Sequence, residues 1–314
     1  MVSAIFRGKA TLGFFLGLVA LLALFPLTKS WAVGMALFLG AAVGNVRPSA
    51  VPPELGSWRK ITLNTAVVLF GFGLDIRQVL AVGSQGFWQT AVSLGVVLAL
   101  GFALRRFFSL PPATTKLITV GTAICGGSAI AAVSSVMKAR DEEVGVAMGV
   151  VFLLNTVALL AFPLLAKMTS LSPEQYGVWC ALSIHDTSSV VGAAAFAGDG
   201  ALSTATILKL TRTLWITPLV FALSLLEGGK GKFSVPPFIL LFLLASIIAS
   251  ALPFAPLFGA LASLGKVFMA EALFLVGLGL RAAALQRAGW RGVLFGGALW
   301  AVSLGVGFGL ASGS

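Results

Sequence analysis

Residues 201–226 read ALSTATILKLTRTLWITPLVFALSLL, and this stretch places two cations in a segment that is otherwise apolar and long enough to cross a lipid bilayer. Lys209 and Arg212 are three residues apart and therefore share one face of a helix. A lipid core penalises a bare cation by about 3 kcal/mol or more. The segment therefore predicts a membrane helix whose cations need a counter-charge, a water-filled cavity or an anionic ligand.

The composition indicates an all-α, polytopic membrane protein. Of the 314 residues, 58% are hydrophobic and 10% are charged, and the mean hydropathy is +1.03, which is not typical of a soluble domain. The formal net charge of +11 does not predict a nucleic-acid partner, because basic residues in such a chain usually lie in short loops that orient it in the membrane. Cys125 and Cys180 both fall in apolar segments, so no disulfide is predicted.

The chain contains about eleven stretches near the ~20 residues that a membrane helix needs. They are Thr11–Leu27, Trp31–Val46, Ile61–Ile76, Phe87–Phe107, Thr115–Met137, Val144–Ala166, Pro173–Ala197, Ala201–Leu226, Val235–Leu252, Leu257–Leu280 and Trp290–Leu310. A cytoplasmic N-terminus then places most basic residues inside, as the positive-inside rule requires for a plasma-membrane protein. The basic residues left outside are Lys29, Arg77, Lys138 and Arg140.

Two short passages recur along the chain. Residues 69–75 (LFGFGLD) resemble residues 275–281 (LVGLGLR), and the string AVSLGV at 91–96 returns unchanged at 301–306. The paired spans, third with tenth and fourth with eleventh, run in opposite directions in this topology, which is what an inverted repeat requires. We therefore expect an extra N-terminal helix (1–28), a first repeat half (31–167) and a second repeat half (173–314).

Two spans are interrupted by residues that disfavour a continuous helix. Gly126, Gly127 and Ser128 lie near the middle of Thr115–Met137, where the glycines end one half-helix and Ser128 is expected to cap a second. The N-terminus of a half-helix at membrane depth could hold an anion through its N–H groups. The alternative is a tight helix contact through small residues.

The second interruption is the string SIHDTSS at 183–189, within Pro173–Ala197. Asp186 and Thr187 are N-cap residues, so a new half-helix is expected to begin at about Val190. His185 is the only histidine of the chain, which excludes a multi-histidine metal site. Beside a carboxylate at membrane depth it is a candidate for binding or proton coupling, although a structural role is equally compatible with the sequence.

The spacing of charges links this second break to the cations. If the chain turns at Asp199, Asp186 and Arg212 lie thirteen residues to either side of it, so antiparallel helices would bring them to the same depth with Lys209 nearby. One interpretation is a buried structural ion pair, and the other is a substrate site with two cations against one carboxylate. We favour the second, because a pair alone leaves one cation uncompensated.

Taken together, these motifs resemble the sulfate exporter family of YeiH-like membrane proteins. The resemblance rests on TAICGGSAIAA (122–132), SIHDT (183–187) with VVG (190–192), KLTR (209–212) and the element GLGL (277–280). It implies an inverted-repeat transporter with a substrate site between crossed, discontinuous helices, similar in outline to bile-acid/sodium symporters and to cation/proton antiporters.

The sequence therefore predicts a secondary transporter that moves a small anion, such as sulfate or an organic sulfonate, by alternating access, with proton or sodium coupling and no cofactor. The alternatives are a passive anion channel and a cation- or proton-coupled carboxylate transporter of the same fold. Neither a nucleophile elbow nor a P-loop is present, so no enzyme activity is expected. Apolar helices permit a homodimer. The candidate binding residues are Lys209, Arg212, Gly126, Gly127, Ser128, His185, Asp186 and Thr187, and the coupling candidates are His185, Asp186 and Glu271.

Overall fold

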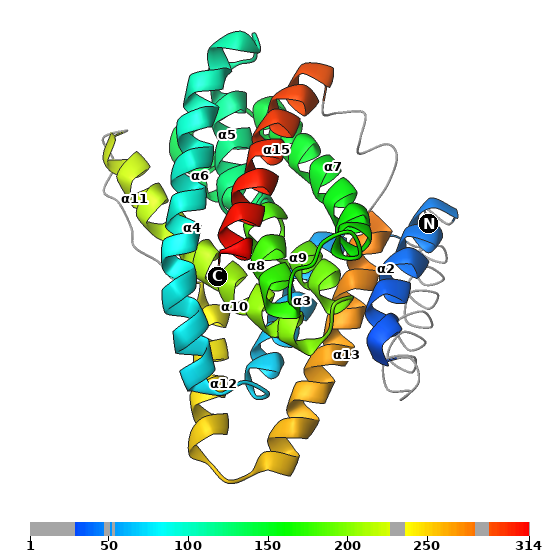
Figure 1. Cartoon of the computed structure of the whole chain (residues 1–314). Helices are drawn as coiled ribbons and strands as arrows, with labels where there is room; N and C mark the ends of the chain where they lie inside the picture. The colour runs from blue at the N-terminus through cyan, green and yellow to red at the C-terminus, as the bar shows by residue number, and fades with distance from the viewer. Residues whose placement is uncertain (1–28, 47–50, 52–53, 227–235, 280–288, 314) are drawn as a thin grey trace. The chain divides into compact units, whose positions relative to one another are not determined.

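A computed structural model describes residues 29–46, 51, 54–226, 236–279 and 289–313, and its regular elements there are all helical (Figure 1). The predicted first span, Thr11–Leu27, lies outside the described residues. The helices are α2 (Lys29–Val46), α3 (Leu55–Gly71), α4 (Ile76–Leu104), η2 (Arg105–Phe107), α5 (Pro112–Ala123), α6 (Gly127–Met137), α7 (Asp141–Ala166), α8 (Pro173–Ser183), α9 (Thr187–Ala195), α10 (Asp199–Leu214), α11 (Ile216–Leu226), α12 (Pro237–Ala251), α13 (Ala255–Gly279) and α15 (Trp290–Ser312).

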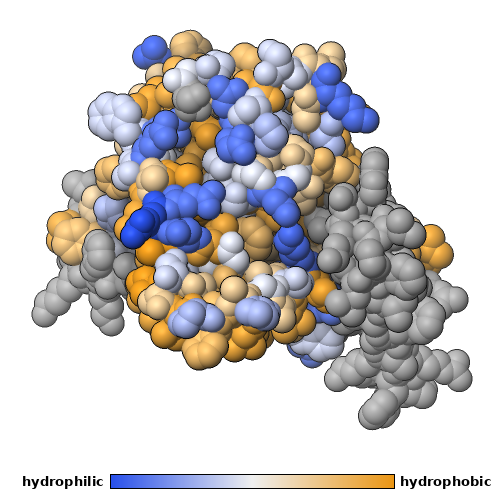
Figure 2. All heavy atoms as spheres, turned by 60° about the horizontal axis from the view of Figure 1, so that its bottom comes forward, coloured by the Kyte–Doolittle hydropathy of each residue, from blue (hydrophilic) through white to orange (hydrophobic). Residues whose placement is uncertain are grey.

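The described helices confirm the prediction of a polytopic membrane protein. Five are long and apolar enough to cross a bilayer: Ile76–Phe107, Asp141–Ala166, Asp199–Leu225, Ala255–Gly279 and Trp290–Ser312. On the face seen in Figure 2, many side chains are hydrophobic and the hydrophilic ones gather in separate patches. The start of α4 differs clearly from the prediction, because this helix begins at Ile76, whereas the fourth span was expected to begin at Phe87. Asp75 starts α4 early, since its carboxylate accepts a hydrogen bond from the Arg77 N–H at 2.7 Å.

The described helices divide into two compact units. The first consists of residues 1–79 and 237–282 and holds α2, α3, α12 and α13. Its helices approach closely through glycines: a Cβ on Gly40 would lie 2.1 Å from the Phe274 carbonyl oxygen, and one on Gly265 would lie 2.8 Å from the Phe70 nitrogen. Because Gly265 lies beside Phe70 while Gly279 lies beside Leu55, α3 and α13 run antiparallel, as the repeated motif predicts.

The second unit consists of residues 80–236 and 283–314. Within it, α5 and α6 form a helical hairpin. A Cβ on Gly121 would lie 2.8 Å from Cδ1 of Ile130, so the two helices are side by side. Pro111, just before α5, and Arg140, just after α6, line the same pocket. The chain therefore enters through α5, turns at residues 124–126 and returns through α6 to the end from which it came.

The helices α8 and α9 form a second hairpin in the same unit. The Tyr176 hydroxyl donates to the Ala193 carbonyl at 3.3 Å, which is possible only if α9 folds back along α8. A Cβ on Gly200 would lie 2.3 Å from a carboxylate oxygen of Glu174, so α10 starts beside the start of α8. Each hairpin is thus followed by a long helix that begins at the open end of that hairpin, α7 after the first and α10 after the second.

These hairpins correct the predicted topology, in which Thr115–Met137 and Pro173–Ala197 each crossed the membrane. A crossing would separate the two ends of the first segment by about 35 Å at 1.5 Å per residue, yet both ends meet at one pocket. Lys138 and Arg140 therefore lie at the same end of the unit as the start of α5, not at the opposite end. The reason is that each break turns the chain back, a possibility that the apolar length of a segment does not reveal.

The helix α15 and the part of α4 from Leu80 onward belong to the second unit, and the two helices, which carry the repeated AVSLGV string, run antiparallel, as predicted. The Gln89 side chain donates to the Leu310 carbonyl at 3.4 Å, whereas Leu110, shortly after α4, and Trp290, at the start of α15, line one pocket. Both helices pack around the hairpins, and Val97 and Leu299 belong to the same hydrophobic core as Ile124 and Ile130.

Candidate functional site

Each hairpin has a tip, the turn between its two helices: residues 124–126 between α5 and α6, and residues 184–186 between α8 and α9. The two tips meet inside the second unit. Gly126 ends the first tip with a φ of 68°, a left-handed conformation that favours glycine. A Cβ at this position would lie 3.4 Å from Cβ of His185, in the second tip, and 3.2 Å from Cγ1 of Val151. Both predicted helix breaks are thus confirmed, and the fold brings them together.

Lys209 and Arg212 lie in the second half of α10, Arg212 in its last turn, and both are completely buried beside the two tips. The Arg212 guanidinium donates four hydrogen bonds to main-chain carbonyls at the ends of α5 and α8. They go to Thr122 (2.9 Å), Ala123 (2.9 Å), Ala181 (2.9 Å) and Leu182 (2.6 Å). The Lys209 ammonium donates to Ile124 at 3.2 Å and to Ile184 at 2.7 Å.

These bonds explain how two cations are tolerated among apolar helices. The last carbonyls of a helix have no partner within it and carry the negative end of its dipole. Two helices, α5 and α8, end against Lys209 and Arg212, so the cations supply the missing donors and the opposite charge together. Through these hydrogen bonds, α10 holds the two hairpin tips in contact.

The ion pair between Asp186 and Arg212, one of the two interpretations of their spacing, is not formed. Asp186 instead caps α9: its carboxylate accepts from the Ser188 N–H at 3.2 Å and from the Ser188 hydroxyl. The Asp186 N–H donates to the side chain of Asn155 at 3.0 Å, and the Asn155 amide donates to the Ser189 hydroxyl. The expectation failed because it assumed two straight antiparallel helices, whereas the chain turns back at Asp186.

The α9 helix begins at Thr187 rather than at about Val190, because Asp186 is its N-cap. The α6 helix begins at Gly127, with Gly126 as its N-cap, so the expected cap at Ser128 was wrong. No side chain caps the start of α6. The first N–H groups of this helix therefore face the tip region without a side-chain acceptor, whereas those of α9 have the Asp186 carboxylate.

Two polar side chains at the tips are buried without hydrogen-bond partners. Both ring nitrogens of His185 and the hydroxyl of Thr122 have none, and each residue is 1% exposed. Leaving a buried donor or acceptor unsatisfied costs about 1–3 kcal/mol. A polar ligand would remove this cost, so the two side chains mark a candidate site beside Gly126.

Residues of α15 also contact the end of α8 next to its hairpin tip, although none of them was among the predicted site residues. Ser303 donates to the Leu182 carbonyl at 2.9 Å, and Trp300 donates to the Ser183 carbonyl at 3.1 Å. Ser303 belongs to the repeated AVSLGV string, which was the signal that could have found it. Its counterpart in the first copy is Ser93, a buried residue of α4 whose hydroxyl has no partner.

The remaining coupling candidate is Glu271. Glu271 belongs to α13, in the first unit, and is half-buried. The other candidates, Gly126, Gly127, Ser128, His185, Asp186, Thr187, Lys209 and Arg212, all belong to the second unit. Their arrangement brings helix ends, two cations and unpartnered polar groups together. No group of His, Cys, Asp and Glu side chains that could hold a metal ion occurs among the described residues.

Comparison with known proteins identifies the family to which the chain belongs. Residues 10–296 match the family model described as conserved hypothetical protein 698. A UPF0324 membrane protein of Geobacter sulfurreducens is 41% identical, covering 84% of this chain and 86% of the relative. Relatives with the same description from Vibrio vulnificus and Photobacterium profundum are each 38% identical, covering 90% and 96% of this chain and 92% and 93% of their own lengths.

No solved structure matches the chain significantly. The family model spans most of the sequence, including both hairpins and the α10 cations. The relatives likewise align over nearly their whole lengths. The chain therefore belongs to the UPF0324 family of membrane proteins.

Proposed function

We propose that the protein is a secondary transporter for a small anion, with sulfate or an organic sulfonate as its substrate class. The observation that carries this proposal is the meeting of two oppositely inserted helical hairpins whose tips hold unpartnered polar groups next to buried cations. Discontinuous helices that meet at mid-depth are typical of binding sites in secondary transporters built on inverted repeats. The resemblance to sulfate exporters supports the same class of substrate.

The balance of charge at the tips favours an anion. Each helix terminus contributes about half an elementary charge, so the two helix ends at the tips and the two helix starts there roughly cancel. Lys209 and Arg212 then face the single carboxylate of Asp186. An excess of about one positive charge remains in a region shielded from water. An anionic substrate would neutralise it.

The hydrogen-bond pattern supports different roles for the two cations. Four of the five guanidinium donors of Arg212 are used on helix carbonyls, so this residue acts mainly as a fixed charge that positions the tips. Lys209 uses two of its three ammonium donors. The anion would then be bound by the third Lys209 donor, His185, the Thr122 hydroxyl and the first N–H groups of α6 at Gly127 and Ser128.

The hairpins also indicate how access could alternate. One hairpin opens toward the starts of α5 and α7, and the other toward the start of α10, so each tip separates the central site from one side of the membrane. Displacing one hairpin at a time would expose the site to one side only. Gly126 and Asp186, the last residues of the two turns, are the positions where the backbone would bend. We further propose that transport is coupled to protons or sodium through His185, Asp186 or Glu271. The protein is also proposed to form a homodimer.

The basic residues of the second unit support a proposed orientation in the membrane. Those near the start of α5 and at the starts of α7 and α15 are Arg105, Arg106, Lys116, Lys138, Arg140 and Arg291. Lys167, after α7, is at the opposite end. The positive-inside rule then places the basic end in the cytoplasm and keeps the N-terminus cytoplasmic in the plasma membrane, since two hairpins that do not cross leave the parity of crossings unchanged.

Transport into liposomes tests the class of function. Purified protein would be assayed with labelled sulfate, sulfite, sulfonates and carboxylates, with and without a pH or sodium gradient. Saturable uptake that is driven by a gradient is expected. Flux that neither saturates nor responds to gradients would instead indicate a passive channel, and uptake restricted to carboxylates would replace the proposed substrate class.

A matched pair of threonine variants tests the site. Thr122→Val removes a buried hydroxyl that has no partner, so thermal stability should be unchanged or higher while affinity for the anion falls several-fold. Thr119→Val is the control, because its hydroxyl already donates to the Thr115 carbonyl at 2.7 Å within α5. Equal affinity in Thr122→Val and the wild type would contradict the placement of the anion at the tips.

A further inference from the structure

A separate pocket of about 320 Å³ lies at the basic end of the second unit. Three helices begin around it: α5 contributes Thr114, α7 contributes Glu142 and Glu143, and α15 contributes Trp290 and Arg291. The starts of α5 and α15 have no side-chain cap. The positive ends of two helix dipoles therefore face this pocket with their first N–H groups uncapped.

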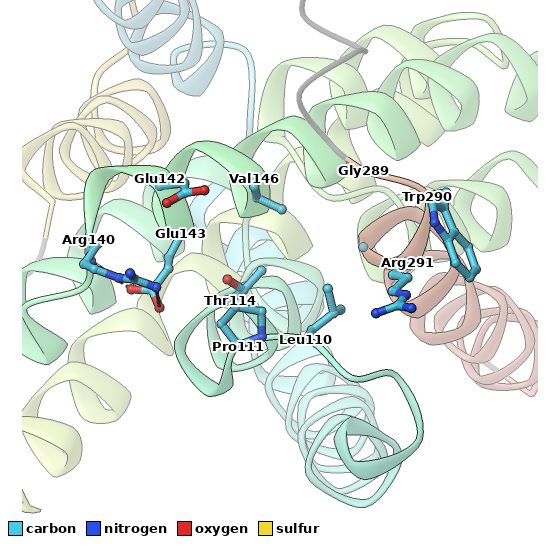
Figure 3. A pocket seen from close by; sticks show the side chains of 11 residues that line it. Leu110, Pro111, Thr114, Arg140, Glu142, Glu143, Val146, Gly289, Trp290 and Arg291 are labelled. Carbon is cyan, nitrogen blue, oxygen red and sulfur yellow. Dashed lines mark hydrogen bonds and ion pairs between the residues drawn. The ribbon is translucent and has the colours of Figure 1, made fainter.

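The charged side chains of the pocket are divided between its two sides. Figure 3 shows Arg140 and Glu143 on one side, Arg291 and Trp290 on the other, and Thr114 between them. Arg140 and Glu143 neutralise each other through an ion pair of 3.1 Å. Glu142 and Arg291 have no ion-pair partner among the described residues, so the pocket offers one unpaired carboxylate and one unpaired guanidinium.

One buried polar group points to a ligand. Thr114 is 2% exposed, lines the pocket, and its hydroxyl makes no hydrogen bond within the described part of the chain. The rest of the lining is largely apolar and includes Leu110, Pro111 and Val146. Trp290 is 69% exposed beside the Arg291 guanidinium, which lies 5.3 Å from the ring centroid. An exposed tryptophan at the end of a membrane-length helix is typical of the headgroup region of a bilayer.

We infer that this pocket binds a membrane phospholipid whose headgroup carries an ammonium group, as in phosphatidylethanolamine. Arg291 and the start of α15 contact the phosphate, and Thr114 donates to a lipid oxygen. Glu142 pairs with the ammonium, and the apolar lining covers the glycerol and the first methylene groups. A free oxyanion such as phosphate satisfies Arg291 but leaves Glu142 and the apolar lining without partners, so the lipid fits the pocket better.

Lipid binding to the full-length protein in detergent tests this inference. Native mass spectrometry and thermal stabilisation would be measured with short-chain phosphatidylethanolamine, phosphatidylglycerol, phosphoethanolamine and inorganic phosphate. The wild type is expected to retain one phosphatidylethanolamine per chain and to bind it about tenfold more tightly than Arg291→Gln does, because a charge-assisted hydrogen bond is lost. Glu142→Gln should abolish the preference for phosphatidylethanolamine over phosphatidylglycerol.

Further variants at the same end of the second unit provide the controls. Arg106→Gln removes an exposed cation that lies 5.0 Å from the Phe107 ring centroid and outside the pocket, so it should bind lipid like the wild type. Thr114→Val should weaken binding several-fold, and Thr114→Ser should preserve it. The inference is overturned if Arg291→Gln and the wild type retain lipid equally, or if phosphoethanolamine or inorganic phosphate binds as tightly as the lipid.

Discussion

Replacing Arg212 by methionine tests whether this cation supports the fold. Methionine keeps an unbranched stem of similar length but has no donor. The carbonyls of Thr122, Ala123 and Ala181 then lose the guanidinium, whereas that of Leu182 still accepts from Ser303. At about 1–3 kcal/mol for each stranded carbonyl, the loss is at least about 3 kcal/mol. Removing one partner of a buried charge interaction costs a similar 3–5 kcal/mol, roughly.

A loss of this size is a large part of the ordinary stability of a folded protein, which is about 5–15 kcal/mol. We therefore expect Arg212→Met to lower the melting temperature in detergent by roughly 10 °C and to reduce the yield of monodisperse protein. Arg106→Met is the control, because its guanidinium lies over the exposed Phe107 ring. It should melt within about 2 °C of the wild type, since surface substitutions rarely change stability by more than about 0.5 kcal/mol.

The same experiment separates a carbonyl-binding arginine from an ion-paired one. If Arg212 neutralised Asp186, the double variant with Asp186→Asn would recover the lost stability. The hydrogen bonds of both residues predict no recovery, because Asp186 caps α9 and Arg212 contacts helix ends. Melting temperatures measured on the wild type, both single variants and the double variant decide the question. A stable Arg212→Met, or rescue in the double variant, would refute the reasoning.

Further predictions concern the two tips. Gly126→Ala places a side chain at a φ of 68° and should cost about 1–2 kcal/mol in thermal unfolding, whereas Gly297→Ala, which meets nothing within 4 Å, should be neutral or stabilising. Asp186→Ala should lose about 1 kcal/mol with the helix cap, and Asp186→Asn should lose little, because asparagine caps a helix equally well. His185→Gln should flatten the dependence of anion flux on pH if the histidine couples transport to protons. A profile equal to that of the wild type would remove His185 from coupling.

The sequence alone determined the class of the protein and the places where its helices break. Hydropathy identifies apolar segments because a bilayer requires internally bonded helices of a minimum length. Gly126 and Asp186 mark the interruptions because glycine tolerates left-handed backbone and aspartate caps a helix start. The same local chemistry singled out Lys209 and Arg212, since a cation within an apolar span always needs compensation.

Only the tertiary structure decided the direction of the chain after each break and the partners of the cations. A half-helix that turns back and one that continues have the same composition, so the apolar length of Thr115–Met137 could not reveal a hairpin. The partners of Arg212 are main-chain carbonyls about 30 and 90 residues away, and a carbonyl carries no side-chain signature in the sequence. Long-range packing brings those helix ends to α10, so the cations bind main-chain carbonyls and hold the two hairpin tips together instead of pairing with Asp186.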